Sequence, residues 1–218
     1  MDVFGRHWEN HAARIFAACR ELVDPDDLLV LAGDISWATR LEEALPDLDD
    51  IGRLPGRKLL LKGNHDFWWQ SRAKIERAVD PSVSLLQNDS HVFGGVAIAG
   101  GRGWSLPGDE YFTAEDEKIY RRELERLRLS FESLAGKTYD HLVAALHYPP
   151  MNARQEDSEV TALLERFGVE VCIYGHLHGD GIAAGFTGER NGIRYQLLSA
   201  DSVGFRPVEV APALLPVV

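Results

Sequence analysis

The segments LLVLAGD at residues 28–34 and KLLLKGNHD at residues 58–66 decide the fold class. Each is a continuous apolar run, as in strands buried on both faces, and each ends in a glycine followed by polar side chains. Helical periodicity over residues 7–23, 41–54 and 71–79 surrounds these runs, with Pro46 expected to interrupt the second helix. Alternating strands and helices of this kind predict an α/β fold.

The pattern changes in the second part of the chain, where short strands, glycines and a long charged helix appear. Residues 84–86, 91–93 and 96–99 are expected to form antiparallel hairpins. Further elements are expected as helices at 113–134 and 158–167 and as strands at 141–146, 169–174, 194–198 and 208–210. No linker or repeat divides the sequence, so residues 1–218 are predicted to form a single domain, with 211–218 as a loosely held tail.

Composition limits the classes of partner. The formal net charge of −11 argues against a nucleic-acid-binding face or an anionic membrane surface, since both demand clustered Lys and Arg. A small phosphorylated substrate remains compatible, because bound dications reverse the local charge. No apolar stretch is long enough to span a membrane. Cys19 and Cys172 are interpreted as buried thiols, which with the absence of a visible signal peptide predicts a cytoplasmic protein of undetermined oligomeric state.

Polar clusters follow four of the apolar runs: Gly33-Asp34, Gly63-Asn64-His65-Asp66, His147 and Gly175-His176-Leu177-His178-Gly179. Carboxylate, amide and imidazole donors together suit Mn, Fe or Zn better than Ca or Mg. Singly, most have ordinary explanations: Asp34 could cap a helix or sit in a turn, and His147 could be structural. An isolated GNHD is as compatible with a turn that exposes its histidine as with a functional site, whereas GHLHG after a buried strand has few explanations other than a functional site.

In this order the clusters GD, GNHD, H and GHxH resemble the calcineurin-like metallophosphoesterase superfamily. The resemblance implies a four-layer α/β/β/α sandwich of two mixed sheets and two divalent ions, Mn²⁺ first with Fe or Zn as alternatives. It implies that a metal-bridging hydroxide attacks a phosphomonoester or phosphodiester. The implied roles are Asp34 bridging both ions, Asn64, His147 and His176 completing metal two, His178 serving metal one, and His65 acting as general acid.

The chain departs from the family pattern in two places. The family opens with Asp-x-His after its first strand, whereas this chain begins MDVFGRHWEN, so the first strand and two ligands of metal one are expected to be missing. A non-catalytic metal-binding or scaffold protein, an inactive truncated form, and a hydrolase of another ester therefore stay open beside the phosphoesterase. The sequence GDISWA also lacks the later Asp of protein-phosphatase GDxxDR, so protein serine/threonine phosphatase activity is not expected.

Other candidates depend on where the fold places them. Arg102 is suited to bind a substrate phosphate, with a plain surface charge as its alternative. Asp66 could orient His65 or serve only in a turn. His7 and His11 could face one ion from a shared helix, although a packed or solvated helix face is the favoured interpretation.

Overall fold

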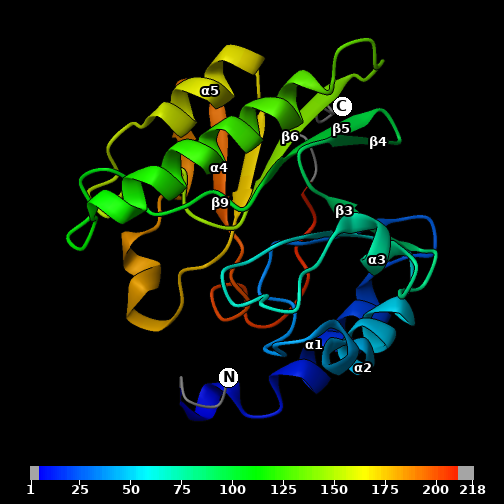
Figure 1. Ribbon diagram of the computed structural model, residues 1–218. Coiled ribbons are helices and arrows are strands. Elements are labelled where there is room, and N and C mark those ends of the chain that lie inside the picture. The colour runs from blue at the N-terminus through cyan, green and yellow to red at the C-terminus, as the bar shows by residue number, and fades with distance from the viewer. Residues whose placement is uncertain (1–4, 211–218) are drawn as a thin grey trace, which may run out of the picture.

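The computed structural model describes residues 5–210, which form two stacked sheets (Figure 1). The smaller, three-stranded sheet has the order β1 (Leu28–Leu31), β2 (Arg57–Leu61), β3 (Val83–Leu86), all parallel. The larger sheet has six strands in the order β4 (Ser90–Phe93), β5 (Val96–Gly101), β6 (His141–Leu146), β7 (Val171–Tyr174), β9 (Ile193–Leu197), β8 (Gly188–Arg190). It is mixed, because β4 and β8 run antiparallel to their neighbours at its two edges.

Helices cover the outer faces of both sheets (Figure 1). The smaller sheet carries α1 (His11–Leu22), α2 (Leu41–Gly52) and α3 (Arg72–Glu76), and the larger carries α4 (Ala114–Glu132) and α5 (Glu159–Phe167). Two 3₁₀ segments, η2 (Arg6–Trp8) and η3 (Gly179–Ala184), complete the described elements. No helix among residues 5–210 is long and apolar enough to cross a membrane.

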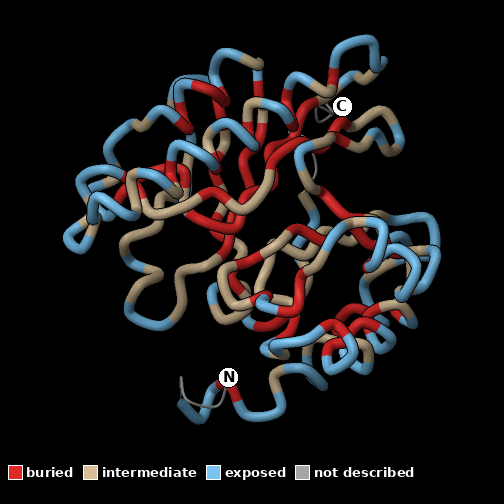
Figure 2. The backbone as a smooth tube through the Cα atoms, viewed as in Figure 1, coloured by how far each residue is buried: buried red, intermediate tan, exposed pale blue. Residues whose placement is uncertain are grey.

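Three apolar layers hold these elements together. Figure 2 shows buried residues along the central strands of the larger sheet and exposed residues on the outer turns and loops. Successive residues of β2 alternate between layers: Leu60 packs beneath the helices of the smaller sheet, whereas Leu59 and Leu61 pack between the sheets. On the other side of that middle layer lie Ile98 and Ile173 of the larger sheet. The architecture is therefore the expected α/β/β/α sandwich, except that the smaller sheet is purely parallel and not mixed as expected.

Several expected elements differ in detail. Residues 83–86 pair parallel with β2 instead of joining a hairpin, and only β4 and β5 form the antiparallel pair. Helix α2 continues through Pro46, which has no backbone N–H to donate to the carbonyl of Glu42; Glu42 is exposed, so water can reach that carbonyl. Residues 208–210 form no strand, while β8 was not expected. The predicted tail 211–218 lies outside the described residues.

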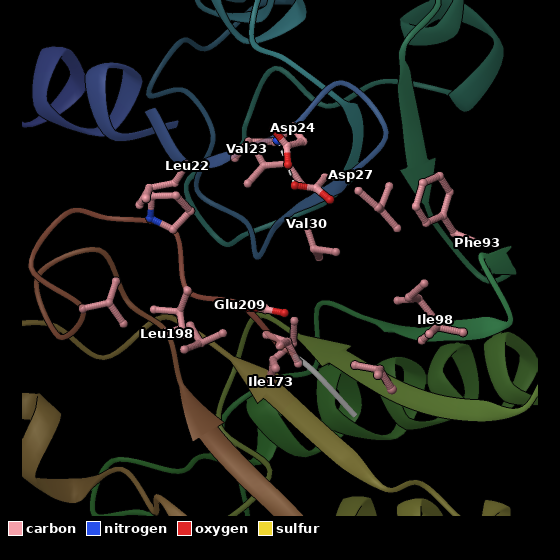
Figure 3. Close-up of a pocket in the computed structure, with 18 of the residues that line it drawn as sticks. Leu22, Val23, Asp24, Asp27, Val30, Phe93, Ile98, Ile173, Leu198 and Glu209 are labelled. Atoms are coloured by element: carbon pink, nitrogen blue, oxygen red, sulfur yellow. Dashed lines mark hydrogen bonds between the residues drawn. The ribbon is translucent and has the colours of Figure 1, made fainter. Parts of the chain in front are cut away.

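Strand β1 lies at the edge of its sheet and pairs with β2 alone. Beside it is a cavity of about 660 Å³, lined by Val30 of β1, by Ile98 and Ile173 of the larger sheet, and by Leu198. Figure 3 shows these side chains facing one another across the space between the sheets. Within residues 5–210 no strand precedes β1.

Candidate metal centre

The loops after β1 and β2 meet closely, and two glycines permit the approach. A Cβ on Gly33 would lie 2.6 Å from Nδ1 of His147 and 2.8 Å from the Cα of Gly63. A Cβ on Gly63 would lie 2.0 Å from Oδ1 of Asp34. Any side chain at either position would therefore push the Asp34 loop away from its neighbours.

Asp34 does not serve as a helix cap. The nearest helix, α2, begins at Leu41 with Arg40 as its N-cap. Asp34 instead holds the left-handed conformation with φ 55°, which is costly for a residue with a Cβ. Its Oδ1 accepts a hydrogen bond from the backbone N–H of His65 at 2.8 Å, and its Oδ2 lies 3.6 Å from Nε2 of His147. The carboxylate is thus directed at the neighbouring loops.

Three further donor atoms converge beside Asp34. Oδ1 of Asn64 lies 2.7 Å from Nε2 of His147 and 2.9 Å from Nδ1 of His176, and the two ring nitrogens are 3.2 Å apart. One ion about 2.1 Å from each donor would separate the donors by roughly 3.0 to 3.4 Å in octahedral or tetrahedral geometry. The observed spacings are close to these values, so the donor set fits a single divalent cation.

The protonation states of the two histidines also suit a metal. Nδ1 of His147 lies 2.8 Å from the carbonyl oxygen of Ala32 and donates to it, which leaves a lone pair on Nε2 toward the cluster. Burial lowers the pKa of His147 against the opposing charge of Asp34. Burial, with His147 nearby, lowers the pKa of His176 to about 4. Both rings are therefore neutral at pH 7, the form that binds metals.

His65 stands apart from this cluster although Asn64 precedes it directly. Its ring stacks on Trp37 with centroids 4.9 Å apart and an interplanar angle of 15°. The ring of Phe67 meets it edge-on at 6.3 Å. Both aromatic side chains are substantially exposed, at 49% for Trp37 and 67% for Phe67. His65 thus lies in an aromatic surround on the rim of the site, separate from the ligand cluster.

His178 borders the same region through a different set of contacts. It lines a cavity of about 540 Å³ together with Asp34, His147 and His176. Its Nδ1 lies 2.8 Å from Oδ1 of Asp201, whose Oδ2 accepts from the backbone N–H of Gly179, also at 2.8 Å. Burial raises the pKa of Asp201, but these two hydrogen bonds outweigh that effect and the net shift is downward.

Asp201 was not among the residues predicted from the sequence, although it carries the same signal as the other clusters. The polar residues Ser199 and Asp201 closely follow β9, which runs parallel to β7, so they emerge at the edge of the sheet where His176 and His178 lie. Polar residues directly after an apolar run are thus the signal that marks them in the sequence.

Asp66 is the second residue whose role the sequence left open. It is fully buried, and no hydrogen bond joins its carboxylate to His65 among the described contacts. Its Oδ1 accepts from the backbone N–H groups of Ile35 and Ser36, at 2.8 and 3.1 Å, and from Nε1 of Trp68 at 2.9 Å. Its Oδ2 accepts from Gly63 N–H at 2.7 Å. Asp66 therefore ties together the loops that carry Asp34 and Asn64.

The remaining candidates lie around this centre. The guanidinium of Arg102 forms an ion pair with the buried Glu123 at 2.9 Å and lies 4.7 Å above the ring of Trp104. His7 belongs to η2 and His11 begins α1, so they do not share a helix. His11 lines the cavity of His178, and its Nδ1 lies 3.0 Å from the carbonyl oxygen of Trp8.

Two stacked sheets with a carboxylate–amide–imidazole cluster at the strand ends define an α/β/β/α protein with a candidate divalent-metal site. The family model for calcineurin-like phosphoesterases matches residues 7–180, and the chain belongs to this family. Its members are in general metal-dependent phosphoesterase-type hydrolases.

Among solved structures, the chain is similar to the sulfate thiohydrolase SoxB of Thermus thermophilus in complex with glycerol. Identity is 14% and the TM-score is 0.45, over 79% of this chain and 33% of that one. The chain therefore spans about a third of the length of that protein. No curated protein matches.

Proposed function

We propose that this protein hydrolyses a phosphomonoester or phosphodiester, with divalent cations bound at the strand ends. The observation that carries the proposal is the convergence of Asn64 Oδ1, His147 Nε2 and His176 Nδ1 within 2.7 to 3.2 Å of one another, beside Asp34. These four residues form metal site two. Asp34 also faces site one, to which His178 belongs.

The donor set bears on which cations bind. One carboxylate, one amide and two imidazoles suit Mn²⁺, our first choice, with Fe or Zn as alternatives. Bound cations would supply Lewis-acid activation of water and charge compensation for the phosphoryl group. The uncharged Asn64 and the neutral rings of His147 and His176 leave Asp34 as the only anion of site two, so these ligands repel an incoming phosphate little.

His65 is proposed as the general acid. Its ring is not part of the ligand cluster, and its backbone N–H donates to Asp34, which fixes the residue next to the centre. Stacking on Trp37 holds the ring in one orientation. Nothing commits its side chain to a metal, so it is available to deliver a proton to the leaving-group oxygen.

The substrate is proposed to be a small phosphorylated molecule, since a net charge of −11 disfavours nucleic acid. Arg102 is proposed to contact the phosphate. Glu123 holds its side chain in place, and the guanidinium fork has further N–H donors to offer. Buried, unpaired Cys19 and Cys172 accord with a cytoplasmic location.

The test joins metal analysis to a hydrolysis assay. After dialysis against Mn²⁺ and removal of excess, the wild-type chain is expected to retain at least one ion and to hydrolyse an aryl phosphodiester or monoester. His176→Ala should lower both. His141→Ala is the matched control, because His141 starts β6, whose other end leads into His147, and pairs with Glu170 away from the centre.

Two results would count against the proposal in different ways. Metal retention without hydrolysis of any phosphoester would favour the non-catalytic metal-binding or scaffold alternative. Absence of bound metal in wild type, or unchanged metal content in His176→Ala, would remove the assignment of site two.

A further inference from the structure

Trp37 is a large aromatic side chain that stays partly in solvent beside the metal centre. It is 49% exposed, whereas Trp68 and Trp69, which follow the next strand, are 0% and 8% exposed. Trp37 also lines the cavity of about 540 Å³ that contains Asp34 and His176. The fold thus buries Trp68 and Trp69 in the apolar interior and leaves Trp37 open at the cavity, where its exposure calls for an explanation other than packing.

The loop that carries Trp37 is anchored on both sides of this residue. On one side, the backbone N–H of Ser36 donates to Asp66 at 3.1 Å, and the Oγ of Ser36 donates to Asp47. On the other side, the backbone N–H of Ala38 donates to the same Oγ at 3.3 Å. Because the backbone is already fixed, a ligand that contacts Trp37 has little chain to order, which lowers the entropic cost of binding.

One face of the indole is covered and the other is open. The covered face stacks on His65, with ring centroids 4.9 Å apart and an interplanar angle of 15°. Among the described residues this is the one ring contact of Trp37, and about half of the residue stays exposed. An open indole face favours a planar aromatic ring, because stacked rings attract each other beyond what the burial of their area contributes.

The position of His65 relates this face to the reaction. His65 is the proposed general acid, so the alcohol that leaves when its P–O bond breaks receives the proton of this imidazole. The group that the alcohol carries is thus brought beside the stacked pair of His65 and Trp37. The open face of Trp37 therefore lies on the leaving-group side of the substrate.

We infer that Trp37 is a specificity-determining residue that stacks on a planar aromatic ring carried by the leaving alcohol of the substrate. The inference rests on the proposed function and deepens it, since it names the class of phosphoester. A nucleobase and a simple arylmethyl group share this stacking chemistry, and the substrates below distinguish the two.

The experiment compares matched esters on the full chain loaded with Mn²⁺. Benzyl phosphate and cyclohexylmethyl phosphate release alcohols of similar size and acidity, and only the first carries an aromatic ring. Wild type should favour the benzyl ester in kcat/KM by about 3- to 10-fold, the usual contribution of an aromatic pair. Trp37→Leu should bring the ratio of the two kcat/KM values close to 1, and Trp37→Phe should keep part of the preference.

Two further measurements separate stacking from an effect on His65. A misplaced general acid lowers kcat/KM for both esters alike and leaves their ratio unchanged. Phe67→Leu is the matched control, because Phe67 also contacts His65, edge-on at 6.3 Å, but does not line the cavity. The binding of 2-phenylethylphosphonate and 2-cyclohexylethylphosphonate, which cannot be hydrolysed, should show the same preference as a ratio of Kd values in calorimetry.

The outcomes separate the inference from the proposed function. Loss of the preference in Trp37→Leu, with the preference kept in Phe67→Leu, supports the inference; the same loss for adenosine 5′-phosphate against ribose 5-phosphate assigns the ring to a nucleobase. Equal kcat/KM for the benzyl and cyclohexylmethyl esters in wild type, or an unchanged ratio in Trp37→Leu, overturns it and leaves the proposed function standing. Hydrolysis of none of these esters, nor of an aryl phosphodiester, refutes the proposed function, and equal Kd values for the two phosphonates would then refute stacking on Trp37 as well.

Discussion

Replacing Asp66 should weaken the packing of the loops that carry Asp34 and Asn64 without removing a proposed metal ligand. The carboxylate accepts four hydrogen bonds, three at Oδ1 and one at Oδ2. In Asp66→Asn an NH₂ group, which cannot accept a hydrogen bond, replaces one of the two carboxylate oxygens. The less costly orientation places this NH₂ toward Gly63, so that one hydrogen bond is lost instead of the three at Oδ1. Losing one of these hydrogen bonds costs about 1 kcal/mol. Alanine leaves all four donors without a partner and should cost about 4 kcal/mol, at about 1 kcal/mol each.

Both values fall below the 5–15 kcal/mol typical of a folded domain, so the variants should remain folded. With a urea slope of about 2 kcal/mol/M, Asp66→Asn should lower the unfolding midpoint by about 0.5 M and Asp66→Ala by about 2 M. Because Gly63 precedes Asn64, Mn²⁺ affinity should fall in the same order. Asp49→Asn is the control, since Asp49 is exposed on α2. An unfolding midpoint for Asp66→Ala within error of wild type would refute the role assigned to this carboxylate.

Three further predictions follow from the centre. His65→Ala should lower kcat by about 10²- to 10⁴-fold on an alkyl phosphoester, with the metal content unchanged. The loss of kcat should be smaller on nitrophenyl esters, and wild-type activity on the alkyl ester would exclude His65 as the general acid. Gly63→Ala should abolish metal retention, because its Cβ would lie 2.0 Å from Oδ1 of Asp34, whereas Gly181→Ala, with its nearest contact at 4.0 Å, should not. The pKa of His176 is about 4 in the fold and about 6.5 unfolded, so the unfolded chain takes up the proton first. The metal-free protein should therefore lose about 1.4 kcal/mol per pH unit as the pH falls from about 6 to 4.5; an equal slope in His176→Asn would contradict this.

The features that the sequence predicted well are those with local signals. The runs at residues 28–31 and 59–61 are continuous and apolar, and the glycine and polar residues that follow mark where each strand ends. Residues 28–31 are only half-buried and not buried on both faces as expected, because β1 lies at the edge of its sheet. His147 and His176 follow the neighbouring parallel strands β6 and β7, so their proximity follows from local pattern plus topology. Asn64 follows a strand of the smaller sheet and joins them only when the two sheets pack together.

The features that the sequence did not predict depend on distant partners. Nothing within residues 83–86 distinguishes a hairpin strand from one that pairs parallel with β2, because the choice of sheet is decided by packing against both layers. Asp66 looks like a turn residue until the loops after both strands are in place, since two of its four donors, Ile35 and Ser36, lie some thirty positions earlier. Arg102 likewise acquires its ion pair with Glu123 only when α4 packs on β5.

The centre takes its donors from both sheets, and this couples metal binding to the packing between them. Asp34 and Asn64 follow strands of the smaller sheet, whereas His147 and His176 follow strands of the larger. Between the sheets the middle layer is interrupted beside β1 by the cavity of about 660 Å³, so apolar packing there contributes less than in a filled interior. A cation held by all four residues would join the sheets at the point where β1 has strand support on one side only. Since such a site is not preformed in the unfolded chain, its binding free energy adds to the free energy of unfolding. With a cation bound as proposed, the four residues would therefore also stabilise the sheet edge that presents Asp34.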